Sequence, residues 1–143
     1  MSRILIVEDE THIAHGLRFN LEAEGHEVDL CERGETALAR IAADPRGYAL
    51  VVLDVMLPGI DGFDVARTLR AKGKLLPILM LTANGSVAHA VAAMRAGATD
   101  FLVKPLAPER LLAALEAAVA GTAAGELRPL TEKIPALLAF DEI

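Results

Sequence analysis

The sequence is poor in aromatic residues and in cysteine. Aromatic side chains account for 3% of the 143 residues, tryptophan is absent, and Cys31 is the single cysteine. One cysteine excludes an internal disulfide, and we expect Cys31 to be a small buried residue in a strand. Hydrophobic residues nevertheless reach 53%, so the core must be built from leucine, valine, isoleucine and alanine. That composition suits helices packed on a small parallel sheet.

Positive charge is also scarce. Lysine and arginine together number 14 against 20 aspartates and glutamates, which gives a net charge of -6. A domain that grips nucleic acid by itself is usually basic, because it must neutralise phosphates. We therefore expect no direct binding of nucleic acid by this domain.

Long apolar runs and the common glycine-rich phosphate loops are missing too. No charge-free apolar stretch is long enough to span a membrane. The first apolar run, residues 4–7, is followed at once by acids, unlike a secretion signal. We expect a cytoplasmic protein without membrane contact, and not a nucleotide-binding enzyme of the phosphate-loop classes. The histidines show no metal-ligand spacing and are expected on the surface or on helix faces: His12, His15, His26 and His89.

What is present is an alternation of short aliphatic runs and helical patterns. The runs occupy residues 4–7, 27–31, 49–53, 77–81 and 99–103. The helical patterns occupy residues 11–24, 34–44, 62–72, 85–95 and 107–120. Continuous apolar runs indicate strands covered on both faces, whereas the alternating run 27–31 is expected at a sheet edge. Five such β-α units predict an α/β fold, a three-layer sandwich with a five-stranded parallel sheet and five helices.

Local signals mark where several elements end. Gly25 is expected to stop the first helix, and Ser86 to cap the fourth helix at its N-terminus. The glycine- and alanine-rich stretch 121–125 predicts a flexible linker. Residues 1–121 are therefore expected to form one domain with a complete core, and residues 122–143 to form a linker or tail whose role the sequence leaves open.

Polar side chains follow four of the five runs, at the points where the expected strands end. In an open parallel sheet the chemistry lies at the carboxyl ends of the strands. Side chains from distant parts of the chain are thus expected to meet in one cleft. They are Glu8, Asp9, Asp54, Thr82 and Lys104.

This set of side chains favours a divalent cation and a phosphoryl group. Mg²⁺ prefers oxygen ligands and takes one or two carboxylates, with water and phosphate oxygens in the remaining positions. Asp9 and Asp54 could ligate the ion directly, and Glu8 through a water. The backbone carbonyl of Met56, two residues beyond Asp54, could supply a further oxygen.

A carboxylate can attack a phosphoryl donor and form an aspartyl phosphate. Catalysis of that transfer consists mainly of positioning and charge neutralisation. Asp54 is the candidate nucleophile, Lys104 a positive partner of the phosphoryl group, and Thr82 a hydroxyl donor to it.

Each residue has a structural alternative, such as a helix cap or a solvated charge. Those alternatives are at least as good for each residue alone, and much weaker for all of them together. The Lys104–Pro105 bond adds support, because such bonds can be cis and so direct a neighbouring side chain.

Four segments carry a family resemblance. They are residues 4–10 (ILIVEDE), 53–62 (LDVMLPGIDG), 81–83 (LTA) and 103–106 (VKPL). In order and spacing they resemble the receiver domain of two-component response regulators, over about residues 2–120. The resemblance implies a flavodoxin-like, CheY-like fold with strand order 2-1-3-4-5, which the periodicity alone does not establish.

The resemblance also implies roles for the residues at the strand ends. Asp54 would accept phosphate from a phosphohistidine on a sensor histidine kinase or a phosphotransfer protein. The implied catalytic set is Asp54, Thr82 and Lys104. The implied ligands of Mg²⁺ are Glu8, Asp9, Asp54 and the carbonyl of Met56.

In the family, a switch pair of residues reports the phosphorylated state, and the resemblance assigns this role to Thr82 and Phe101. The threonine moves toward the phosphoryl group and the aromatic ring turns inward. The surface of the fourth helix, fifth strand and fifth helix then changes for partner binding or for formation of a homodimer. Such a chain is a signalling switch that catalyses its own phosphorylation and slow dephosphorylation, rather than a conventional enzyme.

Two other functions are open at this point. An aspartate-nucleophile phosphatase acting on small molecules also uses an aspartate after a buried strand, but it carries a second aspartate two residues later, where this chain has Met56. A purely structural pseudo-receiver would lack one of Asp54, Thr82 or Lys104. The output class also stays open, because residues 53–82 resemble regulators with a winged-helix output and residues 93–101 resemble other classes.

Overall fold

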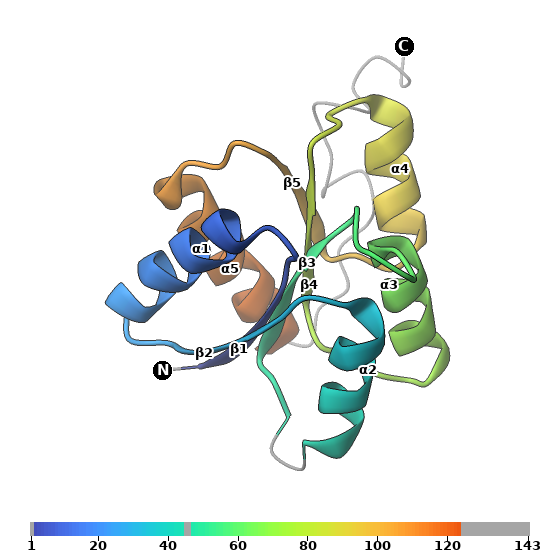
Figure 1. Ribbon diagram of the computed structural model, residues 1–143, viewed down its shortest axis with the longest axis horizontal. Helices are drawn as coiled ribbons and strands as arrows, with labels where there is room; N and C mark the ends of the chain where they lie inside the picture. Colours follow the sequence, from blue (N-terminus) through green and yellow to red (C-terminus); the bar gives the residue numbers. More distant parts are fainter. Residues whose placement is uncertain (1, 45–46, 124–143) are drawn as a thin grey trace.

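The computed structural model describes residues 2–44 and 47–123. Within these ranges, strands and helices alternate along the chain (Figure 1). The strands are β1 (Arg3–Val7), β2 (Glu27–Cys31), β3 (Leu50–Asp54), β4 (Ile78–Thr82) and β5 (Asp100–Val103). The helices are α1 (Thr11–Ala23), α2 (Gly34–Ala43), α3 (Gly62–Ala71), α4 (Val87–Arg95) and α5 (Pro108–Ala123). Every element predicted from the sequence is confirmed, with bounds that differ by a few residues.

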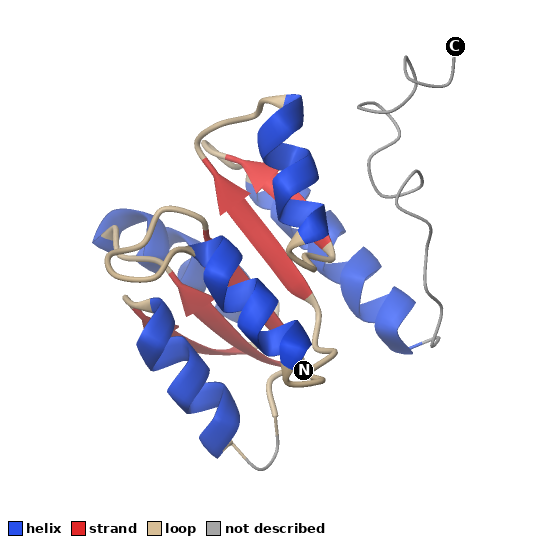
Figure 2. Cartoon of the chain, turned by 90° about the vertical axis from the view of Figure 1, so that its right-hand side faces the viewer, coloured by secondary structure: helices blue, strands red, loops and turns tan. Residues whose placement is uncertain are grey.

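The strands form one parallel sheet in the order β2-β1-β3-β4-β5. This is the order that the family resemblance implied, and the alternating strand β2 lies at an edge as predicted. Helices α1 and α5 cover one face of the sheet, and α2, α3 and α4 cover the other (Figure 1). Figure 2, viewed from the side of α2, α3 and α4, shows the strands behind those helices. The fold is therefore the predicted three-layer α/β sandwich.

Each strand contributes to two cores, because successive side chains of a strand point to opposite faces. Ile4 and Ile6 of β1 belong to the core beneath α1 and α5, whereas Leu5 and Val7 belong to the core beneath α2, α3 and α4. Strands β3 and β4 are buried along their whole length, which accounts for their continuous apolar sequences. The largest fully buried side chains are leucine, isoleucine and methionine, as the scarcity of aromatics predicted.

Cys31 lies in β2 and is buried, as expected from the sequence. Burial raises the pKa of its thiol to about 11, because the thiolate would lose its hydration. Cys31 therefore contributes to the structure as a small apolar side chain.

The predicted helix signals at Gly25 and Ser86 are both confirmed. Gly25 follows the end of α1 with a φ of 91°, a left-handed conformation that glycine adopts without steric cost. The Ser86 side chain accepts a hydrogen bond from the backbone N–H of His89 and so caps α4. This cap is the reason that α4 begins at Val87 rather than at residue 85.

Helix α5 ends later than the sequence indicated. It continues to Ala123, so the linker predicted from Gly121 does not begin there. One glycine inside a helix costs only about 1 kcal/mol relative to alanine, and the alanine-rich sequence around it favours helix. The remainder of the predicted linker and the whole tail 126–143 lie outside the described residues. Among the helices of the described part, none has the length and apolarity needed to cross a membrane.

A charged cluster joins three segments at the amino-terminal end of the sheet. The guanidinium of Arg3 in β1 pairs with Asp44, lies 3.3 Å from Asp29 Oδ2, and stands 4.5 Å above the centre of the Tyr48 ring. The Tyr48 hydroxyl donates a hydrogen bond of 2.7 Å to the same Asp29 oxygen. The cluster connects β1 and β2 to the residues at the end of α2 and before β3.

This cluster gives the single tyrosine of the chain an unusual titration. Burial, and then the hydrogen bond and charge of Asp29, raise the pKa of Tyr48 to about 12. We expect the ultraviolet absorbance change of tyrosinate to be centred near pH 12 in the folded protein, and near 10 in urea, the ordinary value for tyrosine. Because the folded pKa is the higher one, the stability that Tyr48 contributes is complete below about pH 10 and is lost as the pH rises toward 12. A folded-state midpoint near 10 would contradict the Tyr48–Asp29 hydrogen bond, and Tyr48→Phe is the blank that should abolish the signal.

Candidate functional site

The register of the parallel sheet brings four strand ends together. Val7 pairs with Leu53, so that Glu8 follows β1 at the level where Asp54 ends β3. Asp54 in turn pairs with Leu81, the residue before Thr82. Thr82 pairs with Val103, the residue before Lys104, whose N–H donates to the Thr82 carbonyl at 2.8 Å. The backbone alone therefore places these polar residues at one edge of the sheet.

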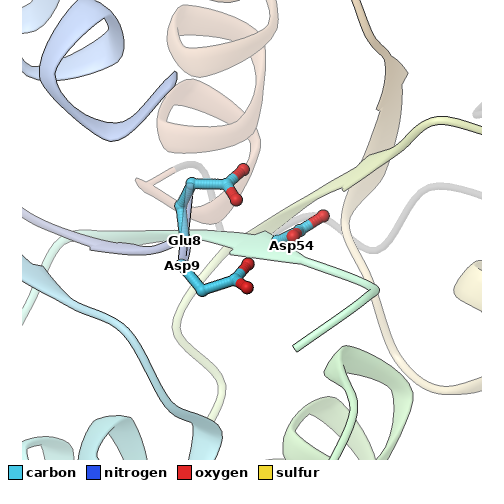
Figure 3. A group of neighbouring side chains, drawn as sticks. All are labelled: Glu8, Asp9 and Asp54. Atoms are coloured by element: carbon cyan, nitrogen blue, oxygen red, sulfur yellow. The ribbon is translucent and has the colours of Figure 1, made fainter. Parts of the chain in front are cut away.

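Three carboxylates gather at this edge, as Figure 3 shows. Glu8 and Asp54 are buried, with 2% and 3% of their surface exposed, whereas Asp9 is exposed. One oxygen of each carboxylate lies within 4.8 Å of the others. The backbone N–H of Glu10 donates to the second oxygen of Glu8 at 3.1 Å and orients that side chain. The sequence pattern did not show that Glu8 is buried while its neighbour Asp9 faces solvent.

The ammonium of Lys104 lies between the two buried carboxylates. Its Nζ is 2.9 Å from Oε1 of Glu8 and 3.1 Å from Oδ1 of Asp54. The peptide bond between Lys104 and Pro105 is cis. Lys104 is thus not the solvated surface charge that was its structural alternative.

Burial and charge act in opposite directions on this group of side chains. Burial raises the pKa of Glu8, and the charge of Asp54 adds to the rise, while the hydrogen bonds from Lys104 and Glu10 oppose it. Burial by itself would lower the pKa of Lys104, but its hydrogen bonds to Glu8 and Asp54 outweigh burial, and the pKa is raised. The ammonium is therefore held in its charged form, and one positive charge faces three carboxylates.

The donor set fits a hard divalent cation. Carboxylate oxygens are the preferred ligands of such ions, and negative charge in excess of the one ammonium would attract them. Asp9 is open to solvent, so an ion could reach it without displacing a packed side chain. Met56 follows β3 by two residues and is 71% exposed. Its thioether is a soft ligand that does not suit a hard cation, so any contribution to the site would come from its backbone carbonyl.

The loop after β3 folds back against the strand end that carries Asp54. The N–H of Gly62, the first residue of α3, donates to the carbonyl of Val55 at 2.8 Å. A Cβ atom at Gly62 would lie 2.3 Å from the backbone oxygen of Asp54, closer than any real Cβ contact. Asp61 accepts from the N–H of Asp64 and caps α3 at this point. Glycine at position 62 therefore permits α3 to begin directly on the backbone of Asp54.

Thr82 lies at the same edge, but its hydroxyl is engaged on the side of α4. Thr82 is 3% exposed, and its Oγ1 accepts from the N–H of Asn84 at 2.9 Å. The same oxygen is 3.1 Å from the carbonyl oxygen of Asn84 and 2.7 Å from Nδ1 of His89. The sequence interpretation had placed His89 on a surface or helix face. The signal that could have found it is the Ser86 cap, which fixes the first turn of α4 beside the end of β4.

Phe101, the expected partner of Thr82, lies in β5 and is half-buried. Its ring packs against the core beneath α2, α3 and α4. Phe101 therefore lies on the face of the sheet that α4, the helix of His89, covers.

Comparison with known proteins identifies the family. The family model described as "Response regulator receiver domain" matches residues 4–116. The chain belongs to this family. The match covers most of the chain and includes every strand end described above.

Curated relatives agree with this assignment. The chain is 47% identical over 133 residues to the response regulator MprA of Mycolicibacterium vanbaalenii, covering 90% of this chain and 57% of the relative. It is 50% identical over 115 residues to the MprA protein of Mycobacterium avium, covering 80% of this chain and 50% of that relative. The receiver chain thus spans about half the length of the curated relatives it matches.

Solved receiver structures have the same fold. A CheY-like receiver domain protein of Methanospirillum hungatei superposes with a TM-score of 0.80 at 27% identity, over 87% of this chain and 98% of that one. The chemotaxis response regulator CheY4 of Vibrio cholerae gives a TM-score of 0.77 at 32% identity, over 82% and 98% of the two chains. The protein is therefore a response regulator receiver domain of two-component systems with the CheY-like fold.

Proposed function

We propose that this receiver accepts a phosphoryl group on Asp54 from a phosphohistidine of a sensor histidine kinase or phosphotransfer protein. The observation that carries the proposal is the position of the Asp54 carboxylate at the end of β3, 3.1 Å from the Lys104 ammonium and beside Glu8 and Asp9. In the transfer, an oxygen of Asp54 attacks phosphorus, the phosphorus–nitrogen bond of the donor breaks, and the imidazole leaves with that electron pair. The product is an aspartyl phosphate.

Glu8, Asp9 and Asp54, with the carbonyl of Met56, are the proposed holders of Mg²⁺. Bound there, the ion would neutralise charge on the oxygens of the phosphoryl group. The buried Glu8 would act through a water, and the exposed Asp9 and the nucleophile Asp54 would ligate directly. The excess of carboxylates over ammonium groups at this edge supports the assignment.

Lys104 and Thr82 are proposed to stabilise the transferred group. The Lys104 ammonium, already 3.1 Å from Asp54 Oδ1, can contact a phosphoryl oxygen attached to that carboxylate with little movement. Preorganised charge of this kind is the main source of catalysis in phosphoryl transfer. Thr82 would donate its hydroxyl hydrogen to another phosphoryl oxygen, which requires it to turn from its present partners.

The proposed output is a change in the surface formed by α4, β5 and α5. Thr82 ends the strand before α4 and Phe101 lies in β5, so that movement of the pair would act on this surface. Val87 of α4 and Val103 of β5 are two of the large apolar side chains that are exposed. A shift in the population of two arrangements would then favour a partner or a second copy of the chain.

Further parts of the proposal concern the chain as a whole. Residues 1–121 are proposed as the receiver unit and residues 122–143 as a linker or tail, with α5 crossing this boundary. The receiver is proposed to be cytoplasmic and to make no direct contact with nucleic acid.

A small-molecule phosphatase is disfavoured, because Met56 stands where such an enzyme has its acidic proton donor and a thioether cannot donate a proton.

Mg²⁺ is expected to raise the melting temperature of the folded receiver. The unfolded chain has no assembled site, so binding stabilises only the native state, by roughly 1.4 kcal/mol at ten times the dissociation constant. For a domain of this size, that corresponds to a rise of a few degrees. Thermal unfolding with increasing magnesium chloride measures it. Asp9→Asn should abolish most of the rise, whereas Glu116→Gln on the exposed face of α5 should keep it. An equal rise in both variants would count against the carboxylate cluster as the binding site.

Incubation with acetyl phosphate and Mg²⁺ is expected to add one phosphate to the chain, detected by intact mass. Asp54→Asn should abolish the addition, because the amide is a poor nucleophile. Asp64→Asn, which removes a carboxylate from the surface of α3, is the matched control and should be labelled like the wild type. Labelling that persists in Asp54→Asn would remove Asp54 from the proposed role. Failure of the wild type to take any label would overturn the proposed function.

A further inference from the structure

The single hydrogen of the Thr82 hydroxyl is already engaged by a partner on the side of α4. A threonine hydroxyl offers one donor and two acceptor positions. Here the oxygen accepts from the N–H of Asn84, and it also contacts the carbonyl of Asn84 and Nδ1 of His89. These partners belong to the start of α4 and the turn before it. To donate to a phosphoryl group on Asp54, the hydroxyl must give up one of them.

The imidazole of His89 is held in place from two sides. The backbone N–H of His89 donates to the Ser86 side chain, which fixes the first turn of α4. The ring meets the ring of Phe63 in α3 edge to face, with centres 5.3 Å apart and planes at 86°. Edge-to-face packing of this kind is a favourable arrangement of two aromatic rings. Nδ1 is therefore aimed at Thr82 by packing that does not involve Thr82.

Both tautomers of the imidazole hold the threonine. If Nδ1 carries the hydrogen, its nearest acceptor is Thr82 Oγ1 at 2.7 Å, closer than the Asn84 carbonyl at 3.2 Å, and the hydroxyl hydrogen is directed to that carbonyl. If Nδ1 is bare, it accepts the hydroxyl hydrogen itself at 2.7 Å. In each case the oxygen of Thr82 is kept on the side of α4, and the imidazole competes with an incoming phosphoryl group.

We propose that His89 is a positioning residue that retains the Thr82 hydroxyl in its unphosphorylated arrangement and so sets how readily this receiver is phosphorylated. The inference rests on the proposed function, since it concerns the threonine expected to contact the phosphoryl group. His89 restrains the reaction, because only the fraction of molecules in which the hydroxyl is released can stabilise the transferred group. Loss of its hydrogen bond enlarges that fraction.

The test compares rates of labelling by acetyl phosphate with Mg²⁺, followed by intact mass. His89→Leu keeps an apolar side chain against Phe63 but removes Nδ1, and it should be labelled about fivefold faster, the change that corresponds to one hydrogen bond. His89→Asn places a polar atom at the position of Nδ1 and should restore a rate near that of the wild type. His26→Leu, before β2 at the opposite end of the sheet, is the matched control and should leave the rate unchanged.

A structural role for His89 would give a different pattern. If His89 only packs against Phe63, the polar atom of His89→Asn will not make its labelling rate differ from that of His89→Leu. Equal rates for both variants and the wild type overturn the inference. A slower rate in His89→Leu overturns it too. In a Thr82→Ala background, His89→Leu should have no further effect, because the bond is already absent. A fivefold effect that persists in that background overturns the inference, because His89 would then act through a group other than the Thr82 hydroxyl.

Nuclear magnetic resonance of ¹⁵N-enriched protein tests the same hydrogen bond without any variant at position 89. The ¹⁵N resonance of His89 Nδ1 should shift in Thr82→Ala and again on phosphorylation of the wild type. An unchanged resonance in Thr82→Ala overturns the inference. These outcomes differ from failure of the proposed function, in which the wild-type chain takes no label at Asp54 at all.

Discussion

A single ammonium group, that of Lys104, lies against two carboxylates that belong to different strand ends and are removed from water. Burial of Glu8 and Asp54 without a positive partner would be costly, since a buried charge that loses its partner destabilises a protein by about 3–5 kcal/mol. The ion pairs at 2.9 and 3.1 Å therefore allow an acidic edge to exist within an aliphatic fold. The compensation is incomplete, because Asp9 adds a third carboxylate, and the remaining negative charge is what suits the edge to a cation.

The parallel register converts this local interaction into a site. Each strand ends within one residue of its neighbour, so that the polar residues meet without any long loop to carry them. Because Gly62 has no side chain, α3 can begin in direct contact with the backbone of Asp54. Only β4 separates the strand of the nucleophile, β3, from β5. The contact between Thr82 at the end of β4 and His89 in α4 connects the nucleophile's edge of the sheet to the surface of α4 and β5.

Much of this arrangement could be predicted from the sequence because it depends on local patterns. Continuous apolar runs reveal strands covered on both faces, the alternation of Glu27–Cys31 reveals an edge, and polar residues after the runs reveal the strand ends. Strand order needed the family resemblance, since periodicity says nothing about neighbours. The extension of α5 beyond Gly121 was missed because neighbouring alanines outweighed one glycine. His89 was missed because its role depends on contacts with Thr82 and Phe63, which only the tertiary fold brings together.

The contact between Gly62 and the backbone of Asp54 also limits which residues position 62 can accept. At position 62 the main chain of a helix touches the main chain of the acceptor strand. A mutation there cannot be absorbed by repacking, because there is no side chain to repack. Any side chain at position 62 would therefore displace the main chain that carries the Asp54 carboxylate, and the cost would fall on the acceptor itself.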